Sequence, residues 1–142
     1  MQDRSRSYAA LLGLAAAYCL ASLVHFVHNA EFLAQYPNLP AWLSRPRVYG
    51  AWLLVTAVGV TGVAAASSRF VLTGLVLVAV YAALGFDGLG HYALAPVSAH
   101  TLAMNLTIGF EVLAASVLLV FTLRQVFLAG RHLAGGAARS AR

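Results

Sequence analysis

The chain has 142 residues, of which 61% are hydrophobic and only 9% are charged. Soluble domains average about 25% charged residues, so this composition excludes an ordinary soluble domain and predicts a membrane protein. The net charge of +5 comes from arginine alone. These arginines flank hydrophobic segments and do not form one basic face, which argues against nucleic-acid binding. A single cysteine, Cys19, excludes an internal disulfide.

Four hydrophobic segments are long enough to cross a bilayer, which takes roughly 20 apolar residues. They lie at about residues 8–27, 48–66, 70–89 and 101–123. We therefore predict an all-α integral membrane protein with a four-transmembrane-helix bundle in residues 1–129. A flexible basic cytoplasmic tail is expected at residues 130–142. The first segment is too long for the core of a signal peptide, so we expect it to be retained.

The distribution of arginine predicts the orientation of the bundle. With the N-terminus inside, the cytoplasmic segments contain seven arginines and the external loops contain only Arg45 and Arg47. The positive-inside rule then favours an N-in, C-in arrangement. We expect the membrane to be a bacterial inner membrane. The long first external loop, residues 29–47, combines prolines with aromatic residues. This composition predicts an interfacial segment, which acts either as a lid over a site below it or as an anchor for the second helix.

Small residues recur at every fourth position of two predicted helices, and lipid-phase helix packing favours small residues at contacts. Each series ends in ionisable residues: Gly13, Ala17 and Ala21 precede His25, and Ala79 and Ala83 precede Asp87 and His91. We therefore expect these polar side chains to point into the bundle, with Asp87 and His91 on one face of the third helix.

Ionisable residues gather near the external end of the predicted bundle. Given about 1.5 Å of rise per residue, four histidines and one aspartate from three helices reach a similar depth. Imidazole and carboxylate groups at spacings of three or four residues are typical ligands of metals in helix bundles. The pattern predicts a site for a transition metal, with zinc or iron favoured and copper the alternative. Its predicted ligands are His25, His28, Asp87, His91 and His100.

Glu111 lies eleven residues after His100, which corresponds to about 16 Å along a helix and places it near the middle of the membrane. At that depth it is expected to lie too far from the histidines to join them. Intramembrane carboxyl groups are costly and therefore mark functional sites. The alternative is a packing role, with a hydrogen bond to Tyr18, Tyr81 or Thr56. Glu31 is expected to be a ligand, a partner of His28 or a solvated group.

Three classes of function follow from these residues. The first is a metal-dependent membrane enzyme that acts on a lipid-like or hydrophobic substrate, with Asp87 and Glu111 as candidate catalytic groups. The second is a haem-binding or electron-transfer subunit, in which haem b has two axial ligands among His25, His28, His91 and His100. The third is an ion or proton transporter, or an accessory subunit of a larger membrane complex, in which Glu111 receives the ion or proton. A homodimer is compatible with all three.

Overall fold

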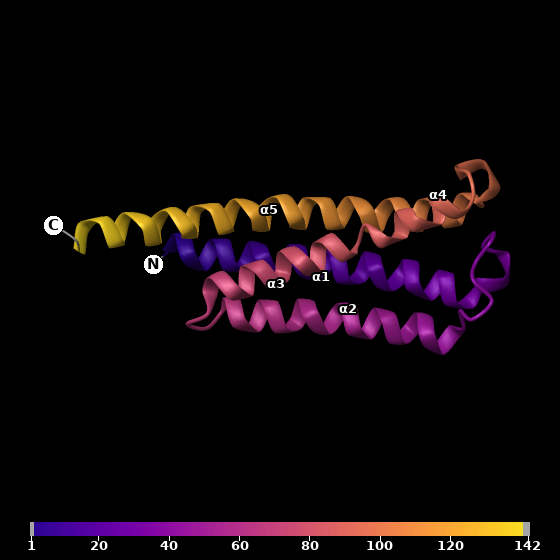
Figure 1. Ribbon diagram of the computed structural model, residues 1–142, viewed down its shortest axis with the longest axis horizontal. Coiled ribbons are helices and arrows are strands. Elements are labelled where there is room, and N and C mark those ends of the chain that lie inside the picture. Colours follow the sequence, from indigo (N-terminus) through magenta and orange to yellow (C-terminus); the bar gives the residue numbers. More distant parts are fainter. Residues whose placement is uncertain (1, 141–142) are drawn as a thin grey trace.

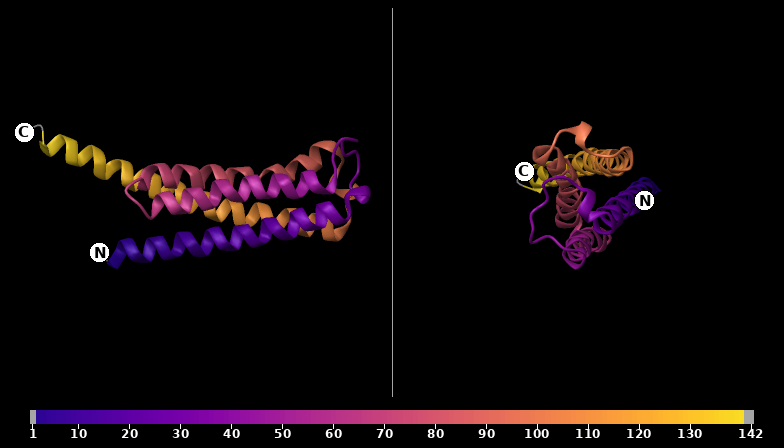
Figure 2. Two further views of the ribbon diagram at one scale, coloured as in Figure 1. Left: turned by 90° about the horizontal axis from the view of Figure 1, so that it is seen from below. Right: turned by 90° about the vertical axis from the view of Figure 1, so that its right-hand side faces the viewer.

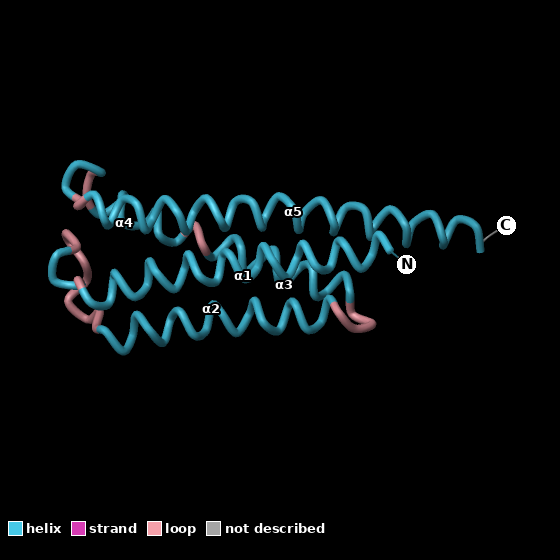
Figure 3. The backbone as a smooth tube through the Cα atoms, turned by 180° about the vertical axis from the view of Figure 1, so that it is seen from behind, coloured by secondary structure: helices cyan, strands magenta, loops and turns pink. Residues whose placement is uncertain are grey.

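The computed structural model describes the backbone of residues 2–140 and the side chains of residues 5–131. Every regular element in this part of the chain is helical, as Figure 3 shows. The α-helices are α1 (Gln2–Glu31), α2 (Arg45–Ala66), α3 (Val71–Leu84), α4 (Gly90–Leu94) and α5 (Leu102–Ser140). Short 3₁₀ helices are η1 (Leu33–Gln35), η2 (Asp87–Leu89) and η3 (Val97–Ala99).

Four stretches of the described chain are long and apolar enough to cross a membrane: Ser5–Glu31, Arg45–Ala66, Val71–Leu94 and Leu102–Arg131. A helix suits lipid because it satisfies all of its backbone hydrogen bonds within one segment. The predicted all-α fold with four membrane-length helices is therefore confirmed.

The four long helices run antiparallel to their neighbours and form a closed ring (Figures 1 and 2). In this ring α1 packs against α2 and α5, and α3 also packs against α2 and α5. One end of the bundle carries both described chain ends and the turn at residues 67–70, and we call it the terminal end. The other end carries the connections at residues 32–44 and 95–101, and we call it the loop end.

The terminal half of the bundle has an apolar core in which α2 and α3 lie very close together. A Cβ atom on Gly62 would lie 2.9 Å from a side-chain carbon of Val78, and one on Gly59 would lie 2.6 Å from the ring of Tyr81. Small residues at such contacts allow close approach of helices in lipid. The buried core includes Leu11, Tyr18, Leu75, Val78, Tyr81, Ala82, Ala115 and Leu118.

The third predicted helix differs from the continuous segment expected at residues 70–89. It breaks after Leu84 and continues through η2 into α4, so this stretch reaches Leu94. Three glycines fall within six residues at the break, at positions 85, 88 and 90. Glycine is a poor helix former, and Gly85 allows an approach in which a Cβ would lie 2.7 Å from the Tyr18 hydroxyl.

The first and last helices are longer than predicted. The first predicted helix, 8–27, lies within α1, and the last, 101–123, corresponds to the first half of α5. The predicted flexible tail begins at residue 130, but α5 remains helical to Ser140. Residues 141–142 of that tail lie outside the described residues.

The expectation that the small-residue series faces the bundle is wrong for α1. Gly13 and Ala17 are exposed, whereas His25 is buried. Successive helix residues are rotated by about 100°, so a series with a constant spacing of four drifts around the helix. The buried face instead alternates spacings of three and four, through Leu11, Ala15, Tyr18, Ser22, His25 and Asn29.

Candidate functional site

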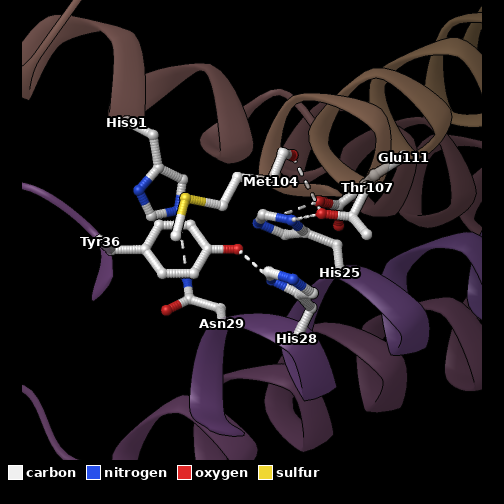
Figure 4. Close-up of polar contacts among 8 residues, drawn as sticks. All are labelled: His25, His28, Asn29, Tyr36, His91, Met104, Thr107 and Glu111. Carbon is white, nitrogen blue, oxygen red and sulfur yellow. Dashed lines mark hydrogen bonds and ion pairs between the residues drawn. The ribbon is translucent and has the colours of Figure 1, made fainter. Parts of the chain in front are cut away.

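The polar side chains of the loop end form one buried cluster between α1, α4, α5 and the first connection. His25, His91 and His100 have exposed fractions of 2%, 9% and 7%, so all three are buried. Asn29, Tyr36 and Glu111 are buried beside them. Figure 4 shows part of this group, with side chains from different elements pointing toward one another. We refer to these six residues, together with His28 and Thr107, as the polar cluster.

The deepest part of the polar cluster is a contact between His25 and Glu111. Nε2 of His25 lies 3.7 Å from Oε2 of Glu111, and Glu111 is only 1% exposed (Figure 4). On the other edge of its ring, Nδ1 of His25 lies 3.4 Å from Oγ1 of Thr107. The prediction that Glu111 lies too deep to join the histidines is therefore wrong.

The reason is the direction in which helical side chains lean. A side chain on an α-helix leans toward the N-terminus of its own helix. Because α1 and α5 are antiparallel, His25 leans toward the terminal end and Glu111 leans toward the loop end. Two residues whose backbones differ in depth can thus meet between the helices.

The break in the third stretch forms one wall of this contact. A Cβ atom on Gly88 would lie 3.2 Å from Oε2 of Glu111 and 3.7 Å from Nε2 of His25. The chain therefore approaches both groups more closely at Gly88 than a larger residue would allow without moving Glu111. The sequence signal for this wall is the glycine-rich segment 85–90, whose role sequence reasoning missed.

Three buried oxygen atoms near this contact have no hydrogen-bond partner among the described residues: Oε2 of Glu111, Oγ of Ser22 and the hydroxyl of Tyr18. Ser22 lies beside both Glu111 and Tyr18. Native proteins pair the great majority of buried polar atoms, so such a group needs a functional or structural reason. Ser22 was not singled out from the sequence, although it lies one helical turn before His25.

His91 lies at the centre of the polar cluster. Nε2 of His91 is 3.1 Å from Nδ2 of Asn29, and its ring centroid is 5.5 Å from that of His25 and 6.2 Å from that of His100. The Asn29 amide donates to His91, which makes Nε2 of His91 an unprotonated acceptor in this arrangement. His91 is brought inward by α4, the short helix that follows the break.

Tyr36 closes the polar cluster from the loop side. It is 4% exposed, its hydroxyl lies 2.9 Å from Nδ1 of His28, and its ring centroid lies 4.8 Å from that of His91. Burial raises the pKa of the Tyr36 hydroxyl to about 12. At neutral pH the hydroxyl is therefore protonated and can donate a hydrogen bond to His28. Sequence reasoning noted the aromatic loop but did not select Tyr36.

The loop that carries Tyr36 is fixed at two points. Asn38 adopts a positive φ of 58°, and its side-chain amide donates to the carbonyl of Leu94 at 2.8 Å. Asparagine tolerates this left-handed conformation better than most residues. Glu31 lies 2.9 Å from Arg45 and accepts a hydrogen bond from Tyr49 at 2.9 Å. Glu31 thus ties the two ends of the loop together, and it is bound to neither His28 nor the rest of the polar cluster.

His100 completes the polar cluster at the start of α5. Its Nδ1 donates to the carbonyl of Pro96 at 3.0 Å. Its Nε2 is buried and has no partner among the described residues. The centroid of the His100 ring lies 6.2 Å from that of His91 and 5.4 Å from that of Tyr92.

Asp87 does not share the buried face of His91. It is exposed, whereas His91 is buried. A spacing of four residues places two side chains on one face only in a continuous helix, and η2 interrupts the helix at Asp87. The structure therefore brings together His25, His91 and His100, leaves His28 half-buried at the edge, and places Asp87 outside.

Among the side chains that the structure describes, no group of three His, Cys, Asp or Glu residues is arranged to hold a metal ion. The predicted metal site remains a prediction. Comparisons of the chain with protein-family models, with curated proteins and with solved structures give no match.

Proposed function

We propose that this protein is a membrane protein that takes up a proton from the loop end and holds it on His25 and Glu111. This is the transport or accessory class of function. The observation that supports it best is the 3.7 Å separation of His25 Nε2 and Glu111 Oε2 at a site where both residues are almost fully buried. Chains of Asp, Glu and His inside a membrane are typical of proton relays.

The net charge of the two groups explains why they would bind one proton. Without a proton, a neutral imidazole beside a carboxylate has a net charge of −1. One proton gives zero net charge, whether the carboxyl group or the imidazole carries it, and a second proton gives +1. A net charge is costly in a site that excludes water, so the singly protonated state is favoured.

The other members of the polar cluster provide an approach from the loop end. An open hollow of about 500 Å³ is formed by the residues of the first connection and the adjoining helix ends, and its lining includes Glu31, Tyr36 and Asn38. From Tyr36 the polar groups continue to His28 and His91, and the His91 ring contacts that of His25. No hydrogen bond joins His91 to His25 among the described residues. Transfer across this gap therefore requires rotation of a ring or a bridging water.

Beyond Glu111 the interior becomes apolar. Below Ser22 and Tyr18 the interior consists mainly of apolar side chains such as Val78, Leu118 and Ala82. A proton that reaches Glu111 from the loop end therefore meets an apolar barrier toward the terminal end. This arrangement favours storage of a proton, with release after a conformational change or to a partner subunit, over continuous conduction.

Infrared difference spectroscopy of the protein in lipid tests this function. We expect a pH change to alter the bands of the Glu111 carboxyl group and of the His25 ring together, because the two groups share one proton. Glu111→Gln should remove the carboxyl change and move the His25 change to a different pH. Thr73→Val, an exposed change in α3, is the matched control and should leave both intact. Independent titration of the two groups would contradict the proposal.

For the orientation, we propose that the terminal end faces the cytoplasm and the loop end faces outward. By the bounds of the helices, Arg6, Arg69, Arg124 and Arg131 belong to the terminal end, and Arg45 and Arg47 belong to the loop end. Trp42, which is 64% exposed and lies near Arg47, fits an interfacial anchor. A reporter fused after Arg142 should be active only in the cytoplasm. Activity only on the outer side would reverse the orientation.

A second candidate is a transition-metal site, and the observation that favours it is the unpartnered, buried Nε2 of His100. Rotation of the His91 and His25 rings toward it would give three imidazole ligands, a set that suits zinc, iron or copper. Elemental analysis should then find one metal per chain, and His91→Ala should lose it. A Soret band in the same sample would indicate haem. Metal-free wild-type protein would exclude this candidate.

A further inference from the structure

A second site lies at the opposite end of the bundle, away from the polar cluster. A cavity of about 550 Å³ opens between the start of α1, the turn between α2 and α3, and α5. Cavities of roughly 300–1,000 Å³ are the size that proteins use for small ligands. Its apolar lining includes Leu11, Val71, Leu75 and Phe121, of which Leu11 and Leu75 are deeply buried.

The rim of this cavity is polar. Ser5, Ser67 and Ser68 are exposed at its edge, and Gln125 adds an amide from α5. The hydroxyls of Ser67 and Ser68 donate to backbone carbonyls at 2.8 Å, which fixes their position in the turn. The cavity thus has an apolar interior and a hydrogen-bonding edge, which matches an amphiphilic ligand.

The charged side chains that the structure describes at the terminal end all have one sign. Arg6, Arg69, Arg124 and Arg131 are exposed at the terminal end. The acidic side chains that the structure describes are Glu31, Asp87 and Glu111, and all of them belong to the half with the loops. Arg6 lies between the lining residues Ser5 and Ser7 in the sequence. Arg69 follows Ser68, and Arg124 precedes Gln125. Arginines therefore flank the rim, and their positive potential favours an anion there.

The position of the cavity identifies the phase from which its ligand comes. The membrane-length stretches begin or end here, at Ser5, Ala66 and Val71. The rim therefore lies at the level of lipid headgroups, and the apolar interior lies at the level of acyl chains. We propose that the cavity binds an anionic phospholipid, with one acyl chain against Leu11 and Leu75 and its phosphate at the arginine-flanked rim.

Lipid retention measured by native mass spectrometry tests this proposal. The protein, purified in detergent, is given equal amounts of phosphatidylglycerol and phosphatidylcholine. We expect the wild type to retain one phosphatidylglycerol per chain in preference to phosphatidylcholine. Val71→Trp should fill the cavity and abolish retention, whereas Leu54→Trp, at a residue of α2 that is 74% exposed, should not. Ser7→Trp fills the same cavity from α1 and serves if Val71→Trp does not fold.

Charge variants separate the two parts of the site. Arg69→Gln and Arg124→Gln should each reduce the preference for phosphatidylglycerol by about fivefold, the effect of one arginine near an anionic surface. Arg47→Gln at the loop end should leave the preference unchanged. Equal retention by the wild type and by both cavity-filling variants would overturn the proposal. Equal retention of the two lipids by the wild type would also overturn it.

Discussion

At the terminal end, α2 and α3 approach so closely that a Cβ atom on Gly74 would lie 2.6 Å from the Cα of Ala66. At the loop end, the same bundle encloses His25, His91 and Glu111, and several polar atoms there have no hydrogen-bond partner among the described residues. The contact between α2 and α3 is packed for stability. The loop end keeps groups that are expensive to bury, which is typical of a functional site in a membrane protein. Mutations in the two regions should therefore change the free energy of unfolding in opposite directions.

The largest expected effect is at the terminal end. Gly74→Ala should lower the free energy of unfolding by about 3 kcal/mol, because the new methyl group meets backbone atoms of Ala66 that cannot move aside. Chemical unfolding in detergent measures the change. Gly109→Ala in α5 is the control, since a Cβ there would meet nothing within 4 Å, and it should not be destabilising. Equal destabilisation by both variants would contradict this description of the packing.

The polar cluster should behave in the opposite way when its deepest contact is removed. The double variant His25→Leu and Glu111→Met replaces two buried polar groups with apolar ones. We expect it to raise the free energy of unfolding by about 1–2 kcal/mol, as replacement of buried ion pairs often does. The same unfolding assay measures it, and proton uptake should be lost. A large loss of stability would mean that the contact serves the fold.

Tyr36 should give a smaller effect that depends on pH. Tyr36→Phe removes the hydrogen bond to His28 and should cost about 1 kcal/mol at neutral pH. Because burial raises the pKa of Tyr36 from 10.0 to about 12, the folded state resists deprotonation. The contribution of the Tyr36 hydroxyl to the free energy of unfolding is complete below about pH 10 and is lost as the pH rises toward about 12.

Unfolding at about pH 9 and about pH 11.5 therefore separates the loss of the hydrogen bond from the deprotonation of Tyr36. The difference in stability between the wild type and Tyr36→Phe should shrink or reverse at the higher pH. Taking the difference removes the contribution of the other tyrosines. A difference in stability that is the same at both pH values would show that Tyr36 is not buried in the polar cluster.

The smallest effect is expected for the contact that closes the loop. Glu31 and Arg45 lie 2.9 Å apart, but their side chains are 41% and 59% exposed. Exposed ion pairs contribute about 0.5 kcal/mol, so a double-mutant cycle with Glu31→Gln and Arg45→Gln should give a coupling of that size. A coupling of several kcal/mol would place Glu31 in the buried site instead of at its edge.

The helices could be predicted from the sequence because lipid leaves few alternatives for an apolar segment of this length. The approximate layer of His25, His91 and His100 followed from counting helical rise. The contact between His25 and Glu111 did not, because it depends on the lean of side chains in antiparallel helices. The exposure of Asp87 depends on a break at Gly85 that periodicity alone does not reveal. Tyr36 was missed because a loop residue has no periodic pattern that indicates burial.

We propose that His25 and Glu111 share one proton inside the membrane. The ¹⁵N chemical shifts of the His25 ring in lipid-reconstituted protein report its protonation directly as the pH is changed. We expect Glu111→Gln to move the titration midpoint of His25 by more than about one pH unit, because the two groups titrate as one coupled site. An identical His25 titration in the wild type and in Glu111→Gln would contradict it.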